Sequence, residues 1–282
     1  MAPLRRRRGT STIWRACGLL DPMLSVSRFV SLARLGASRA TEGWLAKAAV
    51  VATVALALVL AVGMVVLAGD SGARRDVSRW PLAAASIQVW GGGVLVAISA
   101  SSQALLRDAR DGVSDMVARC GSSLNAYLLG RVAGLALVLG LLASGGTLLV
   151  SFFLVLASGS GVGPILHATL AALAGVVAFS VTIAPLALAA LGARSRLGGY
   201  LVLVLVLALP ELLASLVARH LPSGWEELLS VPAAVSAVSD ALAPGTVDAP
   251  RALRACCVLA AFAFGALIAG RGQVARARRV AA

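Results

Sequence analysis

The stretch LLRDARDGVSDMVARCGSSLNAYLLGR, residues 105–131, is the longest charged interruption between the apolar segments of this chain. It contains three aspartates and four arginines, whereas the segments on either side of it are almost free of charge. Each of those segments is long enough for a helix to cross about 30 Å of hydrocarbon, which takes about 20 residues. The charged stretch is therefore expected to lie outside a membrane, between two spanning helices.

The composition of the whole chain supports a membrane protein. Hydrophobic residues make up 59% of the 282 residues and charged residues 13%, against about 45–50% and about 25% in an ordinary soluble domain. A buried core alone does not account for that excess. We predict an all-α, polytopic integral membrane protein with six transmembrane helices, at about residues 46–68, 81–104, 127–157, 165–191, 200–218 and 252–270.

The remaining segments complete the domain organisation. We interpret residues 1–22 as a disordered basic cytoplasmic tail, because no apolar core or cleavage site follows the arginines as in a signal peptide. Within the six-helix transmembrane domain, residues 23–275, the pattern over 26–40 predicts an amphipathic interfacial helix. Short extracytoplasmic helices are expected over about 219–250, and a basic cytoplasmic tail over 276–282.

The net charge of +13 is attributed to membrane topology and to membrane lipid as a partner. Nucleic acid is disfavoured as a partner, because no basic stripe is interleaved with aromatic residues. Most of the 25 basic residues lie in short segments beside apolar runs. The positive-inside rule then places both termini and the charged segment, 105–126, in the cytoplasm, with the chain in the cell's inner (cytoplasmic) membrane. The four cysteines lack metal-ligand spacing, and we expect no metal or cofactor.

Within residues 105–131, glycines bracket a short segment that has an apolar face. Val113, Met116 and Val117 follow the i, i+3, i+4 spacing of one helix face. Asp111 and Ser122 stand where helix caps are common. The pattern predicts a short helix from about Gly112 to Gly121 that docks in a groove of a soluble partner; a solvated loop is the alternative.

The chain resembles the membrane subunits of type-2 ABC exporters over about residues 24–275. The resemblance rests on the order of helices, on the charged segment after span two, and on Tyr127, Leu128, Gly130 and Arg131 at the start of span three. The glutamate-rich flank usual in that family is here aspartate and arginine. The resemblance implies a coupling segment formed by Arg107, Asp108, Arg110, Asp111, Gly112, Val113, Met116, Val117 and Arg119.

The same resemblance implies two partners. One is a cytoplasmic ABC ATPase subunit, because this chain contains no Gly-x-x-x-x-Gly-Lys-Ser/Thr phosphate loop. The other is a second permease copy or a paralogue. The implied function is ATP-driven export, with the chain acting as a transport subunit and not as an enzyme.

Two enzyme classes and a scaffold are the alternatives. Asp108-x-x-Asp111-Gly112 also begins the signature of CDP-alcohol phosphotransferases, which bind metal with four aspartates. Here no acidic residue occurs between Asp115 and Glu211, so that metal site would be incomplete. An intramembrane serine protease is disfavoured because the Gly-x-Ser-Gly sequence of this chain, residues 69–72, lies in the expected loop between spans one and two and not within a span. A membrane scaffold without transport would also fit the composition.

Polar residues inside the spans are candidates for a translocation path, because such groups are costly in hydrocarbon. Glu211 follows Pro210, and the other interpretation is that Pro210 ends span five and Glu211 lies in the outer interface or pairs with Arg219. Gly91–Gly93 in span two is expected to allow close helix contact or a bend. The candidate path residues are Gln88, Ser99, Ser102 and Glu211.

Overall fold

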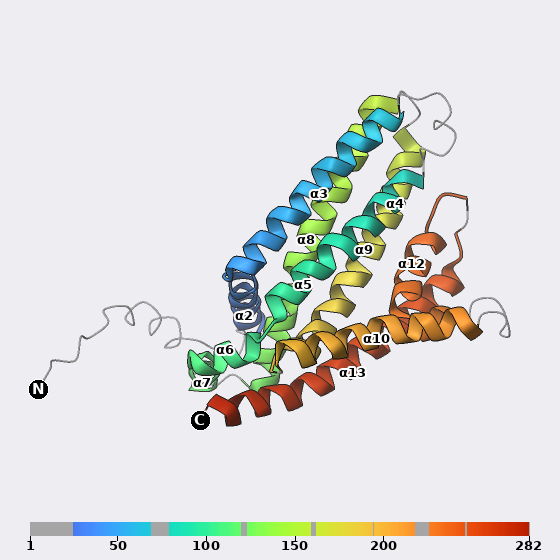
Figure 1. Ribbon diagram of the computed structural model, residues 1–282. Coiled ribbons are helices and arrows are strands. Elements are labelled where there is room, and N and C mark those ends of the chain that lie inside the picture. Colours follow the sequence, from blue (N-terminus) through green and yellow to red (C-terminus); the bar gives the residue numbers. More distant parts are fainter. Residues whose placement is uncertain are drawn as a thin grey trace, which may run out of the picture.

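Figure 1 shows the computed structural model of the chain, whose described residues are 25–68, 79–119, 123–158, 162–193, 195–217, 226–245 and 247–281. Within these ranges every regular element is a helix and there is no strand. The elements are α2 Ser25–Ala40, α3 Trp44–Ala68, α4 Trp80–Ile87, the π-helix η3 Gln88–Gly93, α5 Val94–Ser101, α6 Ala104–Arg110, α7 Val113–Arg119, α8 Leu124–Ser158, α9 Val162–Leu191, α10 Arg196–Val217, α11 Glu226–Leu229, α12 Val231–Ala241 and α13 Ala249–Ala281.

The predicted six-span helical fold is confirmed: six helical segments are long and apolar enough to cross a membrane. Their starts lie within about one helical turn of the predicted spans. The segments are Trp44–Val66, Trp80–Arg110, Leu124–Ala157, Val162–Leu191, Leu197–Ala214 and Ala249–Ala277. The chain is a multi-pass membrane protein.

Two helix ends bear on the predicted boundaries. The alternative interpretation that Pro210 ends span five is wrong, because α10 continues through that residue to Val217, close to the predicted end at about residue 218. The predicted tail over 276–282 is helical as far as Ala281, because α13 extends to that residue. Ala277 is buried in a cluster with Val274 and Leu128, and this packing stabilises the last turns of α13. The predicted N-terminal tail and Arg219 lie outside the described residues.

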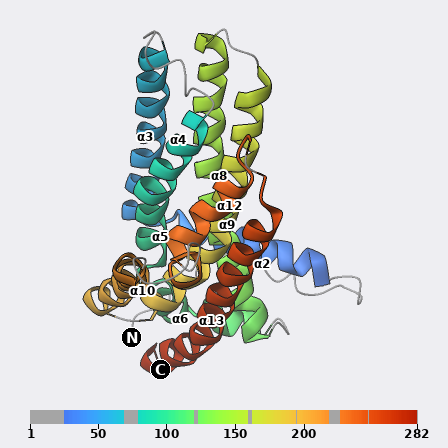
Figure 2. The same ribbon diagram turned by 90° about the vertical axis from the view of Figure 1, so that its right-hand side faces the viewer.

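Helix α9 is the central helix of the bundle. Two-thirds of its most apolar window, 67%, is buried, against 17% for the corresponding windows of α3, α10 and α13. The helices α3, α8 and α9 run side by side, while α10 and α13 cross them at a steep angle (Figures 1 and 2). The outer faces of α3, α10 and α13 are therefore the faces available to lipid.

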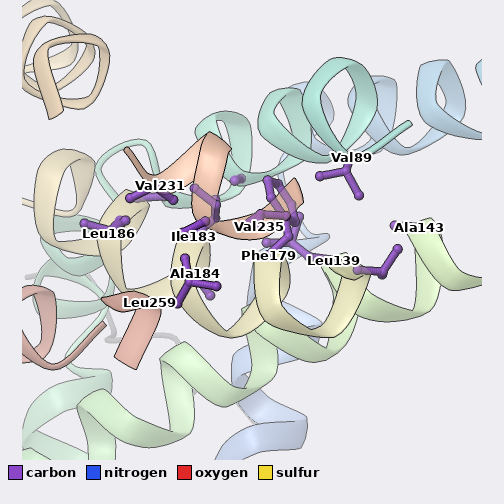
Figure 3. Packing of buried hydrophobic residues seen from close by; sticks show 14 of the residues in the cluster. Val89, Leu139, Ala143, Phe179, Ile183, Ala184, Leu186, Val231, Val235 and Leu259 are labelled. Atoms are coloured by element: carbon purple, nitrogen blue, oxygen red, sulfur yellow. The ribbon is translucent and has the colours of Figure 1, made fainter. Parts of the chain in front are cut away.

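The main core surrounds Phe179 of α9, which is fully buried (Figure 3). Its ring makes an edge-to-face contact with Trp90, with ring centroids 5.3 Å apart, a favoured aromatic geometry. Leu139 of α8 and Val235 of α12 close the core on other sides. The short helix α12 is thus part of the packed bundle, and the backbone of this interrupted region is shielded as an intramembrane segment requires.

The glycine run of span two forms a π-helix, η3, and its last two glycines are close-contact positions. A Cβ at Gly92 would lie 2.6 Å from Thr53 Cγ2, and one at Gly93 would lie 2.9 Å from Phe179 Cε1. The interpretation of these glycines as packing residues fits these contacts. The wider π-turn is a local helix irregularity that sequence periodicity does not predict.

Candidate functional site

The candidate site is the α6–α7 segment, which lies at the same end of the bundle as α2 and the last turns of α13 (Figure 1). We call this the α6–α7 end. The segment begins after the break between α5 and α6 at Ser102 and Gln103. Gln103 has a left-handed backbone, with φ 57°, which is uncommon for a residue other than glycine. This break turns the chain sharply and starts α6 in a new direction.

The first backbone N–H groups of α6 are satisfied by the end of α9. Gln103 N donates to Leu191 O at 3.0 Å, and Leu105 N donates to Gly192 O at 3.0 Å. Helix ends otherwise leave donors and acceptors unpaired. The start of α6 and the end of α9 are therefore joined by backbone hydrogen bonds, so a movement of α6 acts directly on the central helix.

Asp108 lies at the centre of a buried polar cluster, not at the surface. Its side chain is 1% exposed, and its Oδ2 lies 2.9 Å from Arg131 Nε, whose side chain is 6% exposed. Tyr127 Oη donates to the same Oδ2 at 2.5 Å. Arg131 also donates through Nη1 to Gly36 O of α2 at 3.2 Å. We call Asp108, Tyr127 and Arg131 the buried triad; it joins α6, α8 and α2.

A second, more exposed contact holds α2 to the turn between α6 and α7. Arg39 Nη1 donates to Asp111 Oδ2 at 2.8 Å and to Glu42 Oε2 at 3.0 Å. Partial burial by itself would lower the pKa of Arg39, but the hydrogen bond to Asp111 and the charge of Glu42 outweigh it and raise the pKa above its usual value. Arg39 was not predicted from the sequence as a site residue, and it joins α2 to the α6–α7 segment through Asp111.

The crossing of α2 over α8 depends on glycines. A Cβ at Gly134 would lie 2.4 Å from Ala33 O, and one at Gly36 would lie 2.6 Å from Gly130 O. Both backbones approach more closely than any side chain permits. Gly130 and Gly134 have the small-x-x-x-small spacing that is typical of closely packed helix pairs. This spacing is a sequence signal for the contact, although the contact was not predicted.

Helix α7 forms where a short amphipathic helix is expected, but its apolar face points into the chain. Val113 and Val117 are each 6% exposed and pack with Tyr127 and the end of α13. Of the three residues, Met116 presents apolar surface outward, at 38% exposure. The expectation that all three residues face a partner is wrong for the two valines, because the groove that receives them belongs to this chain.

The other predicted coupling residues divide between surface and turn. Arg107, Arg110 and Arg119 are exposed on α6 and α7. Gly112 has φ 70° between these helices, a conformation that glycine adopts without steric cost. The predicted cap Ser122 lies outside the described residues, and it is Ser123 Oγ that accepts from Ala126 N at 3.1 Å. Among the described side chains of α6 and α7, Met116 is thus an exposed apolar residue accompanied by exposed charged residues.

The predicted path residues are held by different elements. Gln88 is 1% exposed and donates through Nε2 to Leu142 O of α8 at 3.3 Å. Ser99 Oγ donates to Val96 O within its own helix at 3.0 Å, and Ser102 is buried at the break before α6. Glu211 accepts a hydrogen bond from Ser230, the N-cap residue of α12.

Glu211 is therefore placed by a local contact. Because α10 is continuous past Pro210, the glutamate lies on a helix and faces the start of α12. Ser230 Oγ also accepts from Ala233 N at 3.3 Å, as an N-cap side chain does. Nearby, Glu227 pairs with Arg251 at the start of α13. These contacts tie α10, α11, α12 and α13 together.

Two aspartates of the α6–α7 segment are paired with arginines. Asp108 pairs with Arg131, and Asp111 pairs with Arg39. Within the described ranges, no three His, Cys, Asp or Glu side chains gather closely enough to hold a metal ion.

Comparison with known proteins leaves the family open. No protein-family model matches this sequence. No curated protein sequence matches it significantly either. The function is therefore argued from the geometry of the α6–α7 end and from the sequence resemblance.

Proposed function

We propose that this chain is the permease subunit of an ATP-driven ABC export system and that the α6–α7 segment receives a separate cytoplasmic ATPase subunit. The observation that carries the proposal is the two-sided construction of this segment. One side is anchored by the buried triad and by Val113 and Val117, and the other presents Met116 among exposed arginines. A solvated loop would need no such anchoring.

The contacts of the segment supply a route for force. A push on Met116 and Arg107 is carried to α8 through Asp108 and Arg131, because a buried ion pair resists separation. It is carried to α9 through the backbone bonds at Leu191 and Gly192. Helices α8 and α9 therefore move with the segment, and the ATPase acts on the bundle without entering it.

The charge distribution supports a cytoplasmic position for this end in the inner membrane. Exposed arginines lie on α2, α6, α7 and the last turns of α13, all at the α6–α7 end. Such an excess of arginine and lysine marks the cytoplasmic side. The permease works with a second copy of itself or a paralogue, so that two ATPase subunits can close on two coupling segments.

The test is purification of the intact chain from membranes in mild detergent, with a matched pair of variants. Met116→Glu places a charge on the exposed apolar spot of α7, and Val247→Glu does the same at an exposed residue before α13. The proposal predicts a copurifying protein with a phosphate-loop sequence and magnesium-dependent ATP hydrolysis. The Met116→Glu chain no longer copurifies with this ATPase, and the Val247→Glu chain still does.

Two results would contradict the proposal. One is that no phosphate-loop protein copurifies with the wild-type chain under conditions that preserve its fold. The other is that both variants retain the ATPase equally, which would separate the α6–α7 segment from ATPase binding.

A further inference from the structure

An apolar cleft of about 500 Å³ opens between α9, α10 and α13. Its lining consists of leucine, valine, alanine, phenylalanine and glycine only. No hydroxyl, amide or charged side chain is among them, so the side chains of the cleft offer no partner to a polar solute. Residues from all three helices contribute, including Leu186, Ala189, Val202, Val206, Phe262 and Gly265.

The cleft lies within membrane-spanning segments and on their outward side. Its α10 and α13 residues fall inside Leu197–Ala214 and Ala249–Ala277. Only 17% of the apolar window of each of these helices is buried, so the outer surface around the cleft is surface for hydrocarbon. An empty space there would lose the dispersion contacts of its lining. A hydrocarbon occupant from the bilayer is the natural filling.

The length of the cleft suits one acyl chain. It follows α13 from Ala261 to Ala269, which is about 12 Å at the rise of an α-helix. A hydrocarbon core about 30 Å thick gives the acyl chains of one leaflet about 15 Å.

The face of α13 that lines the cleft also carries Arg276, closer to the C-terminal end of the helix. Arg276 follows Ala269 by seven residues, which is two helical turns and therefore the same side of the helix. It is exposed, and it makes no ion pair with any residue that the structure describes. Two turns correspond to about 10 Å along the axis. Arginines at this depth attract anionic lipid headgroups.

We infer that the cleft between α9, α10 and α13 binds one acyl chain of an anionic bilayer phospholipid whose phosphate is held by Arg276. The apolar walls select a hydrocarbon chain, and the arginine selects the charge of the headgroup. Zwitterionic lipid fits the same cleft but gains less from Arg276.

The steric test uses two positions on α13 at nearly the same depth. A Cβ at Gly265 has no neighbouring atom within 4 Å, so Gly265→Leu fills the cleft and also raises helix propensity. Ala263 lines a different apolar cleft, between α9, α12 and α13, and Ala263→Leu is the matched control. Native mass spectrometry counts dioleoylphosphatidylglycerol molecules bound to the intact detergent-solubilised chain during a titration.

The wild-type chain is expected to bind one phosphatidylglycerol more tightly than the rest. Gly265→Leu weakens that binding by about tenfold because it removes the packing space, and Ala263→Leu leaves it unchanged. Equal binding by wild type and Gly265→Leu would overturn the inference. So would a loss of dimer by Gly265→Leu with lipid binding unchanged, since the cleft would then be a helix–helix contact.

The headgroup is tested separately. Arg276→Gln is expected to weaken phosphatidylglycerol binding by about fivefold and to leave dioleoylphosphatidylcholine binding as it is in the wild type. If both lipids bind equally to the wild-type chain and Arg276→Gln changes neither, Arg276 holds no phosphate and the assignment is wrong.

Discussion

Removal of the charge of Asp108 is predicted to destabilise the fold strongly. Asp108→Asn keeps the shape of the side chain but leaves Arg131 as an unpaired charge at 6% exposure. Breaking a buried ion pair at one partner costs about 3–5 kcal/mol. Arg131→Met is expected to cost a similar amount, because it leaves Asp108 charged and buried beside Tyr127.

The double variant distinguishes a true pair from two independent effects. Asp108→Asn with Arg131→Met removes both charges, and its loss of stability is predicted to be smaller than the sum of the single losses by about 2 kcal/mol. Asp111→Asn is the control, because it removes a carboxylate three residues away whose ion pair is exposed and worth about 0.2–1 kcal/mol.

The assay is equilibrium unfolding in mixed micelles with increasing sodium dodecyl sulfate, followed by circular dichroism. If Asp108→Asn costs no more than Asp111→Asn, the triad is hydrated and does not anchor α6. If the single losses simply add, Asp108 and Arg131 do not act as a pair.

Three further substitutions test the helix contacts. Gly134→Ala is predicted to cost about 1–3 kcal/mol and to make α2 accessible to protease, since its Cβ would lie 2.4 Å from Ala33 O; Gly145→Ala, which meets no atom within 4 Å, should leave both readouts unchanged. Gly92→Ala is predicted to lower the unfolding midpoint through its clash with Thr53 Cγ2 at 2.6 Å, and adding Thr53→Ala should recover part of the loss; no recovery would place the effect elsewhere. Ser230→Ala is predicted to cost about 1 kcal/mol as the loss of an N-cap, whereas Ser230→Thr should retain most of it; equal losses would exclude a capping role.

The six spans could be predicted because membrane insertion acts on averages over about 20 residues. Leu105 and the charges after it mark the end of such a window without any knowledge of tertiary contacts. Helix α7 was also predictable, since Gly112 and the spacing of Val113, Met116 and Val117 are local signals.

The direction of the apolar face of α7 was not predictable from that spacing. Periodicity says that Val113 and Val117 share a face, but the groove that receives them comes from Tyr127 and from Val274, far along the chain. The burial of Asp108 has the same origin. Its partner Arg131 is not at helical i, i+4 spacing, so only the fold brings the two charges together.

No residue pattern around Gln103 predicts the break between α5 and α6. A left-handed backbone is usually associated with glycine or asparagine, and here the hydrogen bonds from the start of α6 to the end of α9 hold it in place. The α2–α8 crossing is different, because Gly130 and Gly134 have the small-x-x-x-small spacing of closely packed helices. This contact could therefore have been predicted from the sequence.

The most direct test of the proposed coupling is photocrosslinking in intact cells. A benzophenone amino acid replaces Met116 in one chain and Val247 in a control chain, both exposed in the structure. The account predicts that the crosslinker at residue 116 captures a protein with a phosphate-loop sequence and that the crosslinker at residue 247 does not. Capture of such a protein from residue 247 alone, or from neither residue in cells with active export, would contradict it.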